Sequence, residues 1–341
     1  MIKEYGYEYD AVLNVELWEK TRGKVTSERL NGAYCLRSGR DALKAIAQQY
    51  QPRIVLLPAL SCESMIFPFE LFGHKVKFYK LKNDYSIDFE DLYKKIVGEN
   101  ELFLYMDYFG NQSISDIQLE ILKERGLVLI EDRTHSLFGT RSRFFKPDYI
   151  IASLRKWFPI PDGGLLWGNV NEEFGIDTCF AELRLKAQLM RHDYLQNGNE
   201  QIKTEYRKIF ANVSSIMKFD KPCAMSAYSY ALVQSTDWKR VHFQRKRNAD
   251  VLSKMLSPYS FGNSCLYVPF MVDKRDDIQK VLSSVGIFNT IIWPLKESQR
   301  RACETAKHTE THILAAPCDQ RYNEEDMEYI GKEILRVIEN G

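Results

Sequence analysis

Short apolar runs alternate with helical patterns along the first half of the chain. The runs end in turn residues, which is typical of buried strands. Strands are expected at residues 32–37, 54–57, 76–81, 102–106, 127–130, 149–152 and 165–167. Helices are expected between them at residues 41–50, 63–72, 88–97 and 115–125. Strands that alternate with helices in this way predict an α/β fold with a mostly parallel sheet covered on both faces.

The pattern changes after Asn171. It is helical and long up to about residue 257, and it includes one continuous run from Ser226 through Leu256. A compact α+β unit is then expected, with strands at 267–272, 288–293 and 313–316 and helices at 275–284 and 324–338. We therefore predict a large α/β domain over residues 1–240, with residues 1–31 as an N-terminal arm, and a small α+β domain over residues 241–341.

Composition narrows the class of protein. Hydrophobic residues make up 45% of the 341 residues, charged residues 27%, and the net charge is +1, so nothing indicates nucleic-acid binding. The sequence has no apolar run long enough to span a bilayer and no signal-peptide core at its start. The seven cysteines are scattered, with no CxxC pair, which argues against a zinc site or a disulfide framework. We expect a cytoplasmic protein that contacts neither membrane nor nucleic acid.

The stretch 126–168 places charged groups just past the ends of predicted strands. Asp132 follows one strand, and Ser153 and Lys156 follow the next. Ser38 lies just past the end of an earlier strand, so these side chains are expected to meet at one sheet edge. A lysine amine can condense with an aldehyde, and an aspartate can keep a pyridine nitrogen protonated. The pair therefore indicates a pyridine aldehyde cofactor.

An ordered set of motifs runs from about residue 32 to residue 338. Ile130–His135 reads IEDRTH, and Lys156 stands seven residues before the pair Gly163-Gly164. The remaining motifs are Ser38-Gly39-Arg40-Asp-Ala-Leu43, Asp107-Tyr-Phe-Gly110, Met225-Ser226-x4-Ala231, and Ile313-Leu-Ala-Ala-Pro317 followed by Asn323-Glu-Glu-Asp. In this order the chain resembles the DegT/DnrJ/EryC1/StrS family of sugar aminotransferases, which are fold-type-I enzymes that use pyridoxal 5'-phosphate.

The resemblance implies a role for each motif. Lys156 would be the catalytic lysine that holds the cofactor and moves protons. Asp132 would pair with the pyridine nitrogen, and His135 would contact the ring on its oxygen side. The phosphate would be held by Ser38, Gly39, Arg40 and Ser153. The substrates would be glutamate and a keto-sugar on a nucleotide, in polysaccharide or deoxyaminosugar biosynthesis, and the protein would be a homodimer.

Three positions depart from the family pattern. Arg40 replaces the usual threonine, and Cys62 stands where an aromatic side chain stacks on the cofactor ring. Ser153 lies three residues before Lys156, whereas the family spacing is five; Arg155 is a candidate to compensate. These departures support a second hypothesis, a catalytically weakened or inactive homologue that still binds the cofactor or a nucleotide sugar.

Two further functions agree less well with the sequence. A sugar dehydratase of the same family would have histidine in place of the lysine, and Lys156 argues against it. A nucleotide-binding α/β domain without pyridoxal phosphate ranks last, because no GxGxxG follows the first strand and no GxxxxGK[ST] is present.

Overall fold

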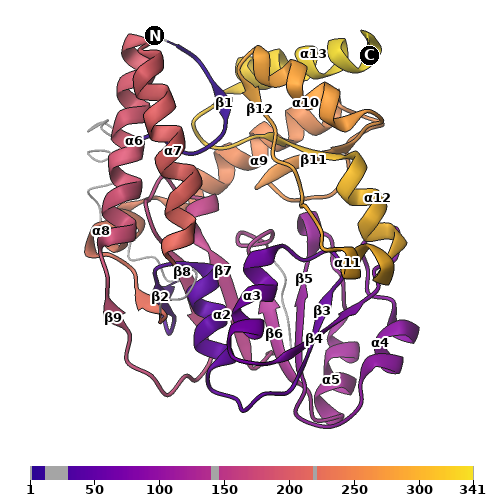
Figure 1. Cartoon of the computed structure of the whole chain (residues 1–341). Coiled ribbons are helices and arrows are strands. Elements are labelled where there is room, and N and C mark those ends of the chain that lie inside the picture. The colour runs from indigo at the N-terminus through magenta and orange to yellow at the C-terminus, as the bar shows by residue number, and fades with distance from the viewer. Residues whose placement is uncertain (1, 12–29, 140–145, 218–220, 341) are drawn as a thin grey trace.

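A nine-stranded sheet forms the centre of the larger part of the molecule (Figure 1). The computed structural model describes residues 2–11, 30–139, 146–217 and 221–340. The strand order is β4-β3-β5-β6-β7-β8-β2-β10-β9. The strands are β2 (Tyr34–Leu36), β3 (Ile54–Pro58), β4 (Lys75–Tyr79), β5 (Leu102–Met106), β6 (Val128–Asp132), β7 (Tyr149–Ser153), β8 (Gly164–Trp167), β9 (Gly175–Ile176) and β10 (Cys223–Ala224).

The direction of these strands decides where their ends meet. The strands from β4 to β7 pair in parallel, and β8 is antiparallel to both β7 and β2. Consequently β2, β6 and β7 run the same way, and their carboxyl ends lie at one edge of the sheet. The prediction of a mostly parallel α/β sheet is confirmed.

Helices follow the strands as the pattern predicts. The connecting helices are α2 (Gly39–Ala47), α3 (Glu63–Leu71), α4 (Phe89–Lys95) and α5 (Asp116–Glu124). Asp88 caps α4 by accepting the N–H of Asp91, and Ser115 forms a capping box with Gln118 at the start of α5. Both helix starts agree with the positions expected from the sequence.

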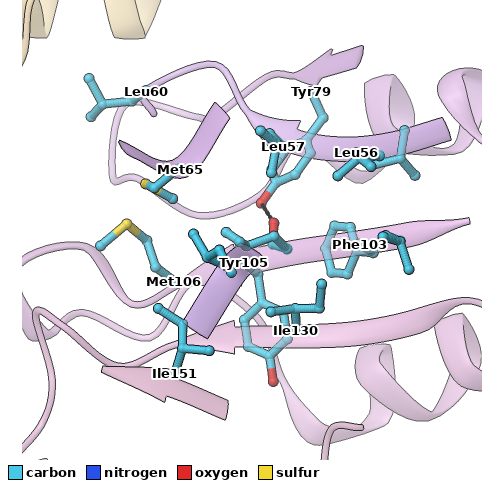
Figure 2. Packing of buried hydrophobic residues seen from close by; sticks show 14 of the residues in the cluster. Leu56, Leu57, Leu60, Met65, Tyr79, Phe103, Tyr105, Met106, Ile130 and Ile151 are labelled. Atoms are coloured by element: carbon cyan, nitrogen blue, oxygen red, sulfur yellow. Dashed lines mark hydrogen bonds between the residues drawn. The ribbon is translucent and has the colours of Figure 1, made fainter. Parts of the chain in front are cut away.

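The core of the sheet is apolar on both faces. Leu56, Leu57, Phe103 and Ile130 are fully buried and interdigitate between β3, β5 and β6 (Figure 2). The hydroxyl of the buried Tyr79 donates to the carbonyl of Leu104 at 2.9 Å, so its polar atom is satisfied. Strands that are buried on both faces have nearly continuous apolar sequences, so the sequence predicts their positions well.

The middle of the chain is helical, but it is not one continuous run. Helices α6 (Cys179–Asn197) and α7 (Glu200–Ile216) lie side by side (Figure 1). The run expected over residues 226–256 is wrong as one helix, because it divides into α8 (Ala227–Ser235) and α9 (Trp238–Met255). The side chain of Asp237 accepts the N–H of Arg240 and so caps the start of α9. Such a hydrogen bond between side chain and backbone interrupts a helical pattern, and hydrophobic spacing does not reveal it.

The C-terminal part is built on a two-stranded antiparallel sheet of β11 (Tyr267–Met271) and β13 (Ile313–Pro317). Helices α10 (Arg275–Ser284) and α13 (Glu324–Asn340) lie where the sequence predicts them. The strand expected at 288–293 is wrong: β12 covers only Ile287–Phe288. Its partner β1 (Tyr5–Gly6) offers only two residues for pairing, and helices α11 (Glu297–Ala302) and α12 (Glu304–His312) soon follow.

The start of the chain packs on its C-terminal part. Strand β1 pairs in parallel with β12, and the N–H of Gly6 donates to the hydroxyl of Tyr322 at 2.7 Å. Most of the predicted arm, residues 12–29, lies outside the described residues, and the domain boundary near residue 240 stays a prediction. Among the described residues, no helix combines the length and the apolar character that crossing a bilayer requires.

Candidate active site

Asp132 is the last residue of β6 and points into the protein at the carboxyl edge of the sheet. It is 5% exposed, and its Oδ1 accepts the N–H of Thr134 at 2.8 Å. Burial raises the pKa of this carboxyl, whereas the hydrogen bonds from Thr134 and the positive charge of Lys156 act in the opposite direction. The structure therefore places a buried carboxyl group within the field of the lysine.

Lys156 ends the short helix η3 (Leu154–Lys156), which directly follows β7. Its ammonium opposes the rise in the pKa of Asp132 and of the Cys62 thiol, and it helps to lower the pKa of His135. Lys156 therefore acts electrostatically on all three groups. The fold brings three separate segments of the sequence toward one sheet edge, with Cys62 on the first, Asp132 and His135 on the second, and Lys156 on the third.

The start of α2 lies against the end of β7 because two glycines leave room for it. A Cβ at Gly164 would lie 2.2 Å from the carbonyl carbon of Ser38, and one at Gly39 would lie 3.5 Å from the Cβ of Ser153. The hydroxyl of Ser38 caps α2 by accepting the N–H of Asp41 at 3.1 Å, and it donates to the carboxylate of Asp41 at 2.8 Å. We call this close approach between the first turn of α2 and Ser153 the Gly39–Ser153 cradle.

Arg40 and Ser153 lie beside this cradle. The guanidinium of Arg40 donates to the hydroxyl of Ser64 at 3.2 Å, and the N–H of Ser153 donates to the hydroxyl of Thr134 at 3.1 Å. Both residues are partly buried, so their side chains lie at the rim of the cradle. Amide groups at a helix start, a hydroxyl and a guanidinium are the groups that bind a phosphate.

His135 is 2% exposed and lies between aromatic rings. It stacks on Trp293 with ring centroids 5.7 Å apart and an interplanar angle of 9°, and the N–H of Phe109 approaches its Nδ1 at 3.5 Å. Burial and the charge of Lys156 hold its pKa well below the ordinary value of 6.5. The imidazole is therefore neutral at physiological pH.

Aromatic side chains from other elements belong to the same apolar cluster as Cys62. Tyr108 donates its hydroxyl to the carbonyl of Leu60, and its ring lies edge-on to Trp293 at 6.4 Å. Burial, and after it the charges of Tyr79, Cys62 and Asp132, raises the pKa of Tyr108 well above its ordinary value. The sequence did not single out Trp293, because its apolar surroundings predicted a strand.

A cavity of about 490 Å³ opens next to Lys156. Its walls are residues 6–9, η3, α7, α9, the start of β11, the end of β12 with the two residues after it, and the segment that begins at the end of β13. Of the eight residues predicted for the site, all of which the structure describes, Lys156 alone lines this cavity. The other seven lie at the sheet edge, outside the cavity wall.

Arg245 on α9 holds the backbone at Lys156 in place. It is 1% exposed and donates to the carbonyls of Lys156 and Trp157, each at 3.3 Å, and to the hydroxyl of Tyr9. The guanidinium of Arg245 also donates to the carbonyl of Cys265 at 3.1 Å. Sequence reasoning missed this residue, because an arginine inside a strongly basic helix reads as part of a solvated face.

A test of the buried imidazole follows from its lowered pKa. The unfolded chain binds a proton at His135 near pH 6.5, whereas the folded protein does not. The free energy of unfolding therefore decreases as the pH falls below about 6.5. The variant His135→Gln removes this term. Between pH 7.5 and 5.5 its free energy of unfolding is expected to fall by about 1 kcal/mol less than that of the unsubstituted protein.

Urea midpoints at the two pH values measure this difference. His308→Gln on the exposed face of α12 is the control variant. An unchanged pH dependence in His135→Gln would show that the folded protein protonates His135 readily.

Comparison with known proteins establishes the fold. No family model matches the chain. An aminotransferase of the DegT/DnrJ/EryC1/StrS type from Brucella abortus superposes with a TM-score of 0.61 at 16% identity, over 97% of this chain and 91% of that one. The PLP form of a sugar aminotransferase, Spr1654 of Streptococcus pneumoniae, gives 0.66 at 14% identity over 98% and 93%.

DesI, solved in the presence of its TDP-sugar product, is a third similar structure. It gives a TM-score of 0.62 at 15% identity, over 95% of this chain and 86% of its own. All three superpositions cover nearly the whole chain. The chain therefore has the fold of the fold-type-I aminotransferases, as the sequence predicts.

A curated protein also matches part of the sequence. GDP-4-keto-6-deoxy-D-mannose 3-dehydratase of Escherichia coli O55:H7 is 28% identical over 87 residues, which is 25% of this chain. The match spans only 22% of that protein's own length.

Proposed function

We propose that the chain is a pyridoxal-phosphate-dependent aminotransferase. The observation that carries this proposal is that Lys156 and the buried Asp132 lie at the carboxyl ends of β7 and β6, which are parallel neighbours. The start of α2 at the Gly39–Ser153 cradle supports a phosphate site, because helix N-terminal amides bind phosphate and Ser153 lies beside them. The residues present therefore fit the phosphorylated pyridine aldehyde that aminotransferases of this fold use.

Each residue then has a defined role. The cofactor, when bound, supplies an electron sink for a carbanion next to the amino group. Lys156 Nζ would hold the cofactor through its aldehyde and would carry the proton that moves during transfer. Asp132 would keep the pyridine nitrogen protonated, and the neutral His135 would offer a hydrogen bond without adding charge. Arg245 keeps the backbone of Lys156 oriented toward the cavity.

The substrates proposed are glutamate as amino donor and a keto-sugar linked to a nucleotide as acceptor. DesI, which shares the fold, was solved with a TDP-sugar product, which supports a nucleotide sugar. The cavity beside Lys156 has an ample volume for a small donor such as glutamate. We also propose a homodimer, in which a second copy completes the site.

An absorption spectrum tests the proposal. The purified chain with pyridoxal phosphate is expected to be yellow, and glutamate is expected to shift the visible band toward shorter wavelength as the amino group is taken up. 2-Oxoglutarate, which has no amino group, is the control addition. A protein that stays colourless with the cofactor would instead support the inactive binding homologue.

A 3-dehydratase is the second candidate function, since the curated match carries that name. Both reactions start from a keto-sugar nucleotide, but their products differ. A panel of such sugars with glutamate, analysed by mass spectrometry, is expected to yield an amino sugar. Loss of a hydroxyl group without a stable amino product would favour the dehydratase.

A further inference from the structure

Arg155 is a partly buried cation with one unused hydrogen-bond donor. It lies between Ser153 and Lys156 and lines the cavity beside the lysine. Its Nε is buried and has no hydrogen-bond partner among the described residues. The ring of Phe180 lies 5.5 Å from the guanidinium carbon. A buried donor without a partner is costly unless a ligand completes it.

The charges around Arg155 strengthen this conclusion. Burial, together with the positive charges of Arg184 and Arg40, lowers the pKa of Arg155 to about 9, far below the ordinary value. Glu8 and Asp162 act in the opposite direction. A guanidinium that is repelled in this way by its neighbours marks a place where an anion would be stabilised.

Both neighbouring acids are already engaged elsewhere. Glu8 pairs with Arg184 at 2.5 Å. The carboxylate of Asp162 accepts the N–H of Ser226 at 2.8 Å and the hydroxyls of Ser226 and Ser229. Neither acid therefore completes the guanidinium of Arg155.

The other arginines of the cavity wall are satisfied. Arg245 donates to backbone carbonyls and to Tyr9, and Arg321 pairs with both carboxylate oxygens of Asp319 at 2.8 and 2.9 Å. Of the arginines described on this wall, Arg155 is the one with an orphaned donor.

We infer that Arg155 binds a phosphoryl group that lies between the Gly39–Ser153 cradle and the cavity. A guanidinium offers a planar fork of donors that matches a phosphate, and Ser153, two residues earlier, lies against Gly39 at the first turn of α2. This placement makes up for the short spacing between Ser153 and Lys156. The inference rests on the proposed function only for the identity of the molecule that carries the phosphate.

Titration of the cofactor-free protein with inorganic phosphate tests the site itself. Phosphate is expected to raise the melting temperature of the unsubstituted protein. In Arg155→Met it is expected to bind roughly 10- to 100-fold more weakly, as expected when a hydrogen bond to a charged group is lost. Arg301→Met, which removes an equal charge from the exposed face of α11, is expected to leave phosphate binding unchanged.

The stability of the variant without phosphate excludes a purely structural role. Arg155→Met is expected to melt at the same temperature as the unsubstituted protein or higher in phosphate-free buffer, because it removes repulsion from Arg184 and Arg40. A variant with lowered stability and unchanged phosphate affinity would overturn the inference.

Paired ligands identify the carrier of the phosphoryl group. If it is the cofactor, Arg155→Met loses affinity for pyridoxal phosphate but not for pyridoxal. If it is the nucleotide, the variant loses affinity for nucleoside diphosphate but not for nucleoside. Equal affinity of variant and unsubstituted protein for all four ligands would refute the inference. Phosphate binding through Arg155 in a protein that stays colourless would instead uphold the inference and reject the proposed function.

Discussion

Substitution of Lys156 by alanine is expected to abolish covalent capture of pyridoxal phosphate while leaving the fold intact. The amine is the nucleophile that joins the aldehyde, and alanine offers no replacement. The side chain is partly buried at the end of η3, and the backbone there is held by Arg245 through the carbonyl rather than the side chain. The loss of binding should therefore come without loss of structure.

Borohydride reduction followed by intact-mass measurement checks this expectation. The unsubstituted protein should gain the mass of one reduced cofactor, and Lys156→Ala should gain none. Lys332→Ala on the exposed face of α13 is the matched control and should behave as the unsubstituted protein does. If the alanine variant at 156 is still labelled, another lysine holds the cofactor.

The same substitution has a second, independent readout. Removing the ammonium takes away an opposing influence on the pKa of Asp132, so this pKa should rise further. It also removes a charge that keeps His135 neutral, so the pKa of His135 should rise. Chemical shifts of the imidazole across a pH titration would follow the second change, and a curve that does not move would place Lys156 away from His135.

The arrangement of the sheet edge could be predicted from sequence for a physical reason. Strands buried on both faces are nearly uniform in apolar character, so the residue where that character ends marks the strand end. Asp132 and Ser153 stand at two such ends, and parallel neighbours bring their ends to one edge. The structure therefore has the carboxyl group and the lysine where the pattern places them.

Residues whose role depends on tertiary contacts could not be predicted. Arg245 is surrounded in sequence by Lys246, Arg247 and other charged residues, and only the fold reveals that it is buried against the backbone of Lys156. Trp293 reaches His135 from the C-terminal part of the chain, more than 150 residues later in the sequence. Hydrophobic periodicity carries no information about either contact.

Cys62 departs from the motif at a position where the fold brings rings from other elements nearby. The motif position lacks an aromatic ring, yet Tyr108 and Trp293 place two rings near Asp132 and His135. A cysteine has no ring to stack, and the sequence gives no means of finding which ring lies nearby. This arrangement weakens the argument that position 62 alone makes the chain inactive.

Asp132→Asn is expected to retain the cofactor but to slow amino transfer by a factor on the order of 10² or more, as for the loss of a preorganised electrostatic group. The amide has the same shape and can still accept the N–H of Thr134, so binding should survive. It cannot keep the pyridine nitrogen protonated, so the ring accepts charge poorly. Single-turnover spectra with glutamate measure the rate, and absorbance measures the retained cofactor.

The stability of this variant separates a functional role from a structural one. Burial raises the pKa of Asp132 in the folded protein. The free energy of unfolding therefore decreases as the pH rises above the pKa that Asp132 has in the unfolded chain. The cofactor-free Asn variant should therefore be at least as stable at pH 7 as the unsubstituted protein. Asp148→Asn, at the opposite end of β7, where Asp148 bonds the N–H of Leu129, is the control and should transfer amino groups normally. Near-normal turnover in Asp132→Asn would remove this carboxyl from the mechanism.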